Sequence, residues 1–473
     1  MEPLIVIFGS TGTGKSDLAV ELASRFNGEI INADAMQMYR GLPIITNKLS
    51  IEDQRGIPHH LLGNIGLDED PWSVVHFKRE ASKIISEIRN RGKLPIVVGG
   101  TTYYLDGLLF EDRLVTTHAS TEGSITSREE LLARYPILSA PADVMLAKLR
   151  EIDPVMADRW HPNDVRKISN SLEIYYTTGR RASDIYAEQR KQKESKSAAQ
   201  ESDVTKAPRH VLLFWLYAER DPLNLRLDSR VDKMVQNGLV REVAEVYDWY
   251  QSRLSSGETP DRSRGIVQSI GFWQFEPYLR AARNSPASPE LAKLKQDAIE
   301  NTKTATRRYA KYQVRWITMK TLASLQAESL LDRLYLLDST DNQGWHDAVA
   351  AKGVELTARF LAGEPIPPPA STSETAQTVL ASCVERSNRQ VTPCNKTCTT
   401  CEKTFLTEEL WQKHITSKVH AKAVRLRTRS SVVPFKQQKT AIVVADSIAL
   451  EKSFPEEARE AGILCTKDTA NPP

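Results

Sequence analysis

The sequence predicts an α/β protein, in which a parallel sheet is covered by helices and interrupted by a helical insertion. Short apolar runs at 4–8, 29–32 and 94–98 alternate with segments of helical apolar spacing at 15–25 and 74–90. This alternation is typical of a parallel sheet with crossover helices. From about 116 to 192 the pattern is mostly helical, and an apolar run returns at 210–217 before long helical segments as far as about 325.

Composition divides the 473 residues into six segments. Hydrophobic residues make up 40% and charged residues 26%, as in an ordinary globular protein, and no apolar run is long enough to cross a bilayer. The stretch GEPIPPP at 363–369, followed by Ser/Thr-rich sequence, is typical of a linker. The predicted segments are 1–115 (first part of the core), 116–208 (helical insertion), 209–345 (second part of the core), 346–392 (helix end and linker), 393–429 (a small module) and 430–473 (a tail).

The N-terminus and the cysteines bear on the location of the protein. The first three residues lead directly into an apolar run, without the basic and apolar regions of a secretory signal. All five cysteines lie after residue 380, and an odd number placed so late favours a metal site over a disulfide framework. We expect a monomeric cytoplasmic protein that does not engage a membrane, with a nuclear or mitochondrial location also open.

A glycine-rich loop follows the first apolar run. Residues 9–16 read GSTGTGKS and match the P-loop pattern G-x-x-x-x-G-K-[ST] between a predicted strand and a predicted helix. The glycines let backbone N–H groups surround phosphate oxygens, the lysine adds a positive charge, and the hydroxyl after it is placed to help hold Mg²⁺. The residues expected to bind phosphate are Gly9, Ser10, Gly12, Thr13, Gly14, Lys15 and Ser16.

Most chains with this loop are kinases or NTPases, which also need an apolar strand that ends in a metal-binding Asp. The run at 94–98 ends instead in Gly99, Gly100 and Thr101. Only the run at 29–32 is followed by an acid, Asp34. A nucleotide kinase or NTPase is therefore an alternative function, and this mismatch counts against it.

The small module has the ligand spacing of a two-Cys, two-His zinc site. Two residues separate Cys398 from Cys401, twelve separate Cys401 from His414, and five separate His414 from His420. Because so small a module cannot fold on its own core, we expect a structural Zn²⁺. The basic run without acids between 414 and 439 suits phosphate contacts, although a solvated tail is the commoner explanation.

Seven motifs, in order within residues 4–316, resemble those of the tRNA dimethylallyltransferases in their eukaryotic form with a C-terminal C2H2 zinc finger. They include IINADAMQMYRGLPIITNK from Ile30, LPIVVGGTTYYLDGLL from Leu94, LDSRVDKMVQNGL from Leu227 and TRRYAKYQVRW from Thr306. The resemblance implies a P-loop parallel-sheet core with a helical insertion domain and a small C-terminal zinc finger. It also implies transfer of a dimethylallyl group from dimethylallyl diphosphate to N6 of the adenosine 3′ of the tRNA anticodon, giving N6-isopentenyladenosine.

The resemblance also assigns roles to single residues. Asp34 matches the general base of the family, and Thr11 and Arg230 match its catalytic residues on the diphosphate side. In these enzymes the glycine-rich loop holds the prenyl diphosphate rather than a nucleotide, with Mg²⁺. The residues implied to bind the target base or line the channel are Gln37, Gly99, Gly100 and Thr101.

Basic and aromatic residues share a predicted helix in the last of these motifs. Arg307, Arg308 and Lys311 have no acid between them, and aromatic residues interleave with them at 309, 312 and 316. Stacking on aromatics combined with cation–phosphate pairing is how unpaired RNA is held. We therefore expect these three residues to contact tRNA, with a solvated basic face as the alternative. A non-catalytic RNA-binding protein, in which the helix and the finger act and the loop is vestigial, is the second alternative function.

Overall fold

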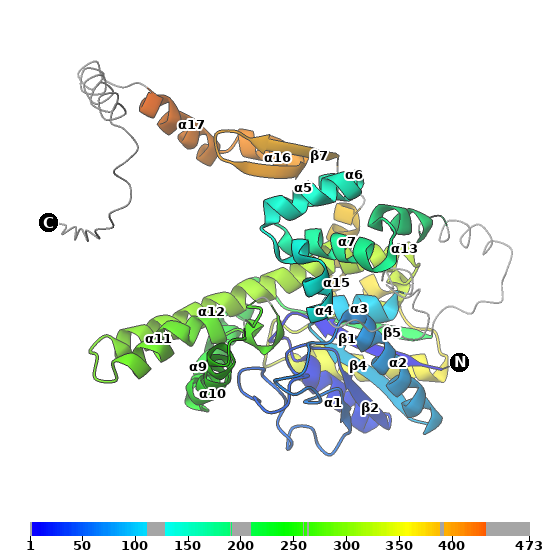
Figure 1. Cartoon of the computed structure of the whole chain (residues 1–473). Helices are drawn as coiled ribbons and strands as arrows, with labels where there is room; N and C mark the ends of the chain where they lie inside the picture. The colour runs from blue at the N-terminus through cyan, green and yellow to red at the C-terminus, as the bar shows by residue number, and fades with distance from the viewer. Residues whose placement is uncertain are drawn as a thin grey trace, which may run out of the picture. The chain divides into compact units, whose positions relative to one another are not determined.

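The computed structural model describes residues 2–110, 128–189, 191, 210–258, 260–262, 264–387 and 392–431 (Figure 1). The chain divides into two compact units, one of Met1–Ser124 and Asp184–Arg389 and the other of Ile125–Ser183 and Gln390–Pro473. Within the described ranges, no helix combines the length and the apolar character needed to span a bilayer.

The first unit is built on a six-stranded sheet with parallel pairing throughout, in the order β3-β2-β4-β1-β5-β6. The predicted parallel sheet is confirmed, with two strands that the sequence patterns did not reveal, β3 and β6. The strands are β1 (Leu4–Gly9), β2 (Gly28–Asn32), β3 (His59–His60), β4 (Leu94–Gly99), β5 (Val211–Tyr217) and β6 (Leu334–Asp338).

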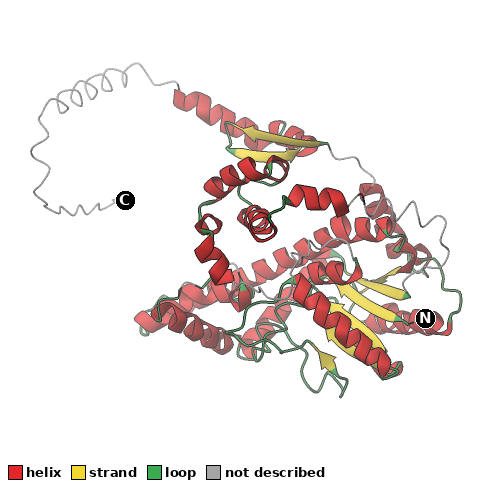
Figure 2. Cartoon of the chain, turned by 45° about the vertical axis from the view of Figure 1, so that its right-hand side comes forward, coloured by secondary structure: helices red, strands yellow, loops and turns green. Residues whose placement is uncertain are grey.

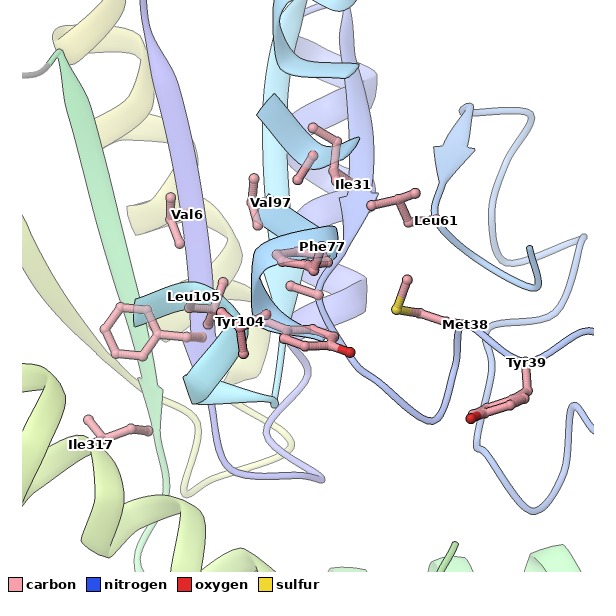
Figure 3. Close-up of a cluster of buried hydrophobic side chains, with 14 of the residues drawn as sticks. Val6, Ile31, Met38, Tyr39, Leu61, Phe77, Val97, Tyr104, Leu105 and Ile317 are labelled. Carbon is pink, nitrogen blue, oxygen red and sulfur yellow. The ribbon is translucent and has the colours of Figure 1, made fainter. Parts of the chain in front are cut away.

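Helices cover both faces of this sheet (Figure 2). Alternate residues of β1 enter two separate cores, one shared with α1 (Lys15–Arg25) and α14 (Lys352–Ala362), the other with α2 (Val74–Asn90) and α3 (Thr102–Leu109). A strand that is buried on both faces must be apolar throughout, which is why β1 and β4 show no polar alternation. Figure 3 shows Phe77 of α2 and Tyr104 of α3 beside Val97 of β4, and the two rings stack with centroids 4.3 Å apart.

Long helices follow β5 in the same unit, as the sequence predicts. They are α9 (Arg220–Gln236), α10 (Leu239–Ser255), α11 (Phe272–Asn284) and α12 (Leu291–Trp316), which continues through Ile317–Thr321 into α13 (Leu322–Ala327). α12 packs against both α9 and α11. The Lys303 ammonium lies 2.8 Å from the carboxylate of Asp232, so charge pairing supports the packing of α12 on α9.

The described part of the predicted insertion is helical. Its helices include α4 (Arg128–Arg134), α5 (Ala142–Ile152), α6 (Pro154–Arg159) and α7 (Val165–Thr178). Asp153 is buried and fixes two segments, because its carboxylate accepts hydrogen bonds from Met156 N at 3.1 Å and from Ser183 N at 2.9 Å. The rest of this prediction, at 116–127, 190 and 192–208, lies outside the described residues, as does the predicted tail after residue 431.

The segment predicted as a helix end and linker, 346–392, contains the end of a helix, and a second helix follows its proline-rich stretch. α14 extends to Ala362, and a further helix, α15 (Glu374–Ser387), packs on the sheet unit with Ala376 and Cys383 almost completely buried. The Thr375 hydroxyl donates to the Asp338 carboxylate at the end of β6, at 2.7 Å. Apolar residues at 376, 379, 380 and 383 give α15 a helical stripe, which the Ser/Thr-rich composition around it concealed. The other segment boundaries stay predictions.

A buried carboxylate joins three elements at the β3 edge of the sheet. Glu29 of β2 is 3% exposed, and its carboxylate lies 2.7 Å from the imidazole of His60, 2.6 Å from the guanidinium of Arg91 and 2.9 Å from the ammonium of Lys93. Burial alone would raise the pKa of Glu29, but hydrogen bonds from Arg91, His60 and Lys93 lower it to about 2. The ionised carboxylate therefore stabilises the fold.

We predict that Glu29→Gln lowers the free energy of unfolding by about 2 kcal/mol at neutral pH, because partly exposed cations lose their buried partner. The folded-state pKa lies below the ordinary value of 4.5, so this contribution is complete above pH 4.5 and is lost as the pH falls towards 2. Urea titrations of wild type and variant at several pH values measure it. Glu87→Gln, which removes only an exposed pair with Lys83, is the control, and an equal effect of both substitutions would contradict the prediction.

Candidate active site

The glycine-rich loop leaves the carboxyl end of β1 and enters α1 at Lys15, as the motif predicts. Gly14 has φ +81°, and a Cβ on it would lie 2.6 Å from Trp345 Nε1, so a side chain is excluded on both grounds. The Thr13 hydroxyl and the Lys15 ammonium both donate to Ser10 O, at 2.9 and 2.7 Å. Burial lowers the pKa of Lys15 to about 8, although the charge of Asp34 opposes the shift. The loop thus holds a partly desolvated cation in a fixed frame.

Two arginines of α9 reach the same loop. Arg230 donates to the Thr11 hydroxyl at 2.9 Å, and Arg226 donates to Gly12 O at 2.9 Å and to Ser339 O at 2.7 Å. Burial lowers the pKa of Arg230 to about 10, against the attraction of Asp34, so it remains charged at neutral pH. The predicted pair of Thr11 and Arg230 is therefore in direct contact, and Arg226 ties the loop to the end of β6.

Asp34 lies in the turn after β2, where hydrogen bonds fix its carboxylate. Asn32 accepts from Asp34 N at 3.1 Å and donates to Leu61 O at 2.9 Å, and the Asp34 carboxylate accepts from Met36 N at 3.1 Å. Burial raises the pKa of Asp34, while the positive charge of Lys15 opposes that shift. A carboxylate with a raised pKa beside two cations is suited to accept a proton.

The Gly-Gly-Thr sequence at the end of β4 supports this turn. A Cβ on Gly99 would lie 2.3 Å from Ala33 O, so only glycine lets the two strand ends approach. The Thr101 hydroxyl accepts from Ala35 N at 3.0 Å. Gly99 and Gly100 line the cavity described next, whereas the hydroxyl of Thr101 is engaged in holding the backbone beside Asp34.

A cavity of about 750 Å³ lies between the loop, the Asp34 turn, the end of β4 and α9. It brings together most of the residues that the sequence singled out as catalytic, phosphate-binding or base-binding. Those lining it are Thr11, Gly12, Gly14, Lys15, Ser16, Asp34, Gln37, Gly99, Gly100 and Arg230. Those absent from its lining are Gly9, Ser10, Thr13 and Thr101, and also Arg307, Arg308 and Lys311 of α12.

Four further residues of the site escaped the sequence analysis: Asn32, Lys48, Arg226 and Gln313, all of which line the cavity. The Lys48 ammonium donates to Gly41 O at 2.5 Å and to the Thr46 hydroxyl at 3.0 Å, and burial lowers its pKa to about 8 against the charges of Glu242 and Asp34. Lys48 ends the motif that begins at Ile30, and Gln313 belongs to the one that begins at Thr306. Membership of these motifs was the available signal for Asn32, Lys48 and Gln313, whereas Arg226 lies just before the motif that begins at Leu227.

The basic residues of α12 divide into two kinds. Arg307 is paired, because its guanidinium contacts both carboxylate oxygens of Asp228 on α9. Arg308 and Lys311 are exposed and have no ion-pair partner within the described part of the chain, and Tyr312 beside them is 54% exposed. The predicted RNA-facing surface is therefore available at Arg308 and Lys311, while Arg307 is engaged in packing α12 on α9.

The predicted zinc ligands lie together in the small module, which consists of β7 (Pro393–Cys398), β8 (Lys403–Thr407), α16 (Glu408–Ile415) and α17 (Lys418–Ser431). The ligand atoms of Cys398, Cys401, His414 and His420 are all within 4.8 Å of one another. The buried His414 Nε2 has no hydrogen-bond partner among the described residues, which fits a nitrogen directed at a metal. Two thiols and two imidazoles at this separation match the donor set of tetrahedral Zn²⁺.

Aromatic packing completes this module. Phe405 stacks on His414 with ring centroids 4.5 Å apart and meets Trp411 edge-on at 5.9 Å. Cys394 stands outside the ligand group, since its thiol donates to Phe405 O at 3.5 Å. The second ligand pair is thus held against the small core of the finger.

Models of known families match two parts of the chain. The family described as IPP transferase matches residues 37–320, and that described as a zinc-finger double-stranded RNA-binding family matches residues 394–421. The chain belongs to the IPP transferase family. The resemblance drawn from the seven motifs and the fold class that it implied are therefore confirmed.

Similar proteins extend the match beyond the family model. The tRNA dimethylallyltransferase of Schizosaccharomyces pombe is 38% identical, covering 90% of this chain and 95% of the relative. That of Saccharomyces cerevisiae is 34% identical, covering 90% and 93%, and that of Homo sapiens is 33% identical, covering 90% and 87%. A solved structure described as a eukaryotic dimethylallyltransferase acting on tRNA is similar with a TM-score of 0.70 at 32% identity, covering 93% of this chain and 100% of the other.

The zinc site yields a direct prediction. Cys401→Ser should abolish stoichiometric zinc and unfold residues 394–421, because the small aromatic core cannot keep this module folded without the metal. Zinc content by mass spectrometry and limited proteolysis measure the two effects. Cys394→Ser is the matched control and should retain one zinc per chain. Loss of zinc from the control with retention in Cys401→Ser would show that the ligand set is different.

Proposed function

We propose that this protein transfers a dimethylallyl group from dimethylallyl diphosphate to N6 of the adenosine 3′ of the anticodon in tRNA. The observation that carries this proposal is that a buried carboxylate, Asp34, and the cationic phosphate loop face one cavity. Membership of the IPP transferase family and the names of the similar proteins support it. The direct test is to incubate the protein with labelled dimethylallyl diphosphate, Mg²⁺ and tRNA, and to identify the product nucleoside by mass.

The acceptor side of the reaction needs a base. The adenine amino group is a weak nucleophile, because its lone pair is delocalised into the ring. As N6 forms a bond to the allylic carbon it must lose a proton, which the Asp34 carboxylate is placed to accept. The target base must leave its stack to enter the cavity, and we infer that Gln37, Gly99 and Gly100 line its path.

The donor side must stabilise a leaving diphosphate. The bond between the allylic carbon and the diphosphate oxygen breaks, and its electron pair goes to the diphosphate. Lys15, Arg230, the Thr11 hydroxyl and the N–H groups of the loop are placed to stabilise the negative charge that develops there. The cavity wall also offers oxygen donors at Ser16 and Asp17, which suit Mg²⁺, and the ion would supply further charge neutralisation when bound.

The alternatives are weaker. A kinase or NTPase would need a metal-binding acid at the end of β4, where this chain has glycines. A vestigial loop would not need to keep Lys15, Arg230 and Asp34 buried around one cavity. We further propose a cytoplasmic place of action, with nucleus and mitochondrion also open, and a monomeric enzyme.

We predict that Asp34→Asn lowers kcat by about 10²–10⁴-fold, because the amide keeps the shape of the side chain but cannot take the proton. Binding of tRNA should change less than about threefold. Steady-state transfer assays and filter binding measure the two quantities. Asp53→Asn, which changes another carboxylate that lines the cavity, is the control, and unchanged turnover in Asp34→Asn would exclude its role as base.

The dependence of kcat/KM on pH should have two limbs. Because burial raises the pKa of Asp34, the acidic limb should lie above the ordinary carboxyl value of 3.8. Because the pKa of Lys15 is about 8, the free enzyme loses this charge above pH 8, and kcat/KM for the diphosphate should fall there. Lys48 also has a pKa of about 8, so a Lys48→Met variant distinguishes the two lysines. If the variant keeps the basic limb, the limb belongs to Lys15, and if the variant loses the basic limb, the limb belongs to Lys48.

The salt dependence of tRNA binding should distinguish Arg308 and Lys311 from Arg307. Arg308→Ala or Lys311→Ala should weaken tRNA binding by about tenfold at low salt and reduce the salt slope by about one, as expected for a lost phosphate contact. Arg307→Ala should leave the slope unchanged and lower stability by about 1 kcal/mol, because it breaks the pair with Asp228. A reduced slope in Arg307→Ala alone would reverse this assignment.

A further inference from the structure

Gln313 differs from the other buried residues of α12. The others are Ala298, Thr302, Thr306 and Ala310. The two threonine hydroxyls donate back to carbonyls of their own helix, at 2.7 and 2.8 Å. Gln313 is 2% exposed, yet both polar atoms of its amide bond to other elements. A buried amide with two long-range partners indicates a specific connection rather than filling of space.

The connection joins the two sides of the cavity. The Oε1 atom of Gln313 accepts from Thr11 N at 2.8 Å, and its Nε2 donates to Gly100 O at 2.9 Å. The partners fix the orientation of the amide, because Thr11 N can only donate and Gly100 O can only accept. One side chain thus spans from the phosphate loop to the end of β4.

Each end of this bridge lies beside a reacting group. Thr11 also receives the hydrogen bond from Arg230, on the side where a diphosphate would be held. A Cβ on Gly100 would lie 3.5 Å from Asp34 Oδ2, on the side where the proton would be accepted, and 2.5 Å from Gln313 Nε2. This amide therefore connects the donor half of the site to the acceptor half.

We propose that Gln313 is a positioning residue that fixes the distance between the diphosphate loop and the acceptor base, an inference that rests on the proposed function. Group transfer requires the nucleophile and the electrophilic carbon to meet at roughly 3–3.5 Å in line with the leaving group, and a misplacement of about 1 Å can cost about 10²-fold in rate. Among the described residues, no hydrogen bond joins Gln313 to Asp34 or Lys15. Gln313 acts through the two backbone segments that carry them.

The test compares three variants of the full chain. Gln313→Met keeps the volume of the side chain but neither hydrogen bond, and its kcat should fall by about 10–100-fold, with KM for both substrates within about threefold of wild type. Thr306→Val, which removes a buried hydrogen bond confined to α12, is the matched control and should keep kcat within twofold. Melting temperatures of all variants show whether a loss of kcat follows stability.

The third variant, Gln313→Glu, gives a readout that a purely structural role would not move. Its carboxylate still accepts from Thr11 N, but donates to Gly100 O only when protonated. The ratio of its kcat to that of wild type should therefore rise as the pH falls. Provided that wild type transfers the prenyl group, any of three results would overturn the proposal. These are a ratio that does not depend on pH, a kcat of Gln313→Met within twofold of wild type, and a loss of kcat in Thr306→Val equal to that in Gln313→Met. Absence of transfer by wild type would overturn the proposed function itself.

Discussion

Inside the cavity, burial disfavours the charged form of Asp34, and the positive charges of Lys15 and Arg230 oppose that effect. Burial raises the pKa of Asp34 and lowers those of Lys15 and Arg230, and the attraction between Asp34 and each of the two cations opposes these shifts. Charges held in a low dielectric interact strongly with whatever enters between them. A bound diphosphate would pair with Lys15 and Arg230, and Asp34 would then lose part of the attraction that favours its ionised form. The affinity of Asp34 for a proton should therefore increase when the donor is bound.

The parallel sheet makes this compensation possible. β1, β2 and β4 are neighbours in the order β2-β4-β1, so their carboxyl ends meet at one edge. The phosphate loop follows β1, the Asp34 turn follows β2, and the Gly-Gly-Thr sequence follows β4. Ligands of such sheets bind in the crevice outside these ends. The same topology explains why Gly99 must be a glycine: the end of β4 passes so near Ala33 that a Cβ would overlap its carbonyl oxygen.

Features that depend on local sequence were predictable. The phosphate loop and the zinc ligands are defined by spacing over short stretches, and the helices at 15–25 and 74–90 have the same bounds in the structure. Features that depend on contacts between distant segments were not. β6 lies in a leucine-rich stretch among helices, and α15 follows a proline-rich segment, so local composition gave the wrong signal for α15 and none for β6. Arg307 looks like its neighbour Arg308 in sequence, and only the position of Asp228 on α9 separates them.

Gln313 is the extreme case of this dependence, because its two partners are 302 and 213 residues away in the chain. Neither the periodicity of apolar residues nor the spacing of a motif can reveal such a bridge. A polar residue on a helix with many cations would be predicted to be exposed to solvent. The bridge can be inferred only once the burial of Gln313 is known, because a buried amide that has lost its hydrogen bonds to water must form hydrogen bonds within the protein. α12 therefore contributes both to the surface proposed to bind tRNA and to the cavity. Its exposed cations suit a polyanion, and its buried amide ties together the loop and the strand end between which the reaction is proposed to occur. Because both features belong to one helix, a shift of α12 would displace the exposed cations and the amide together.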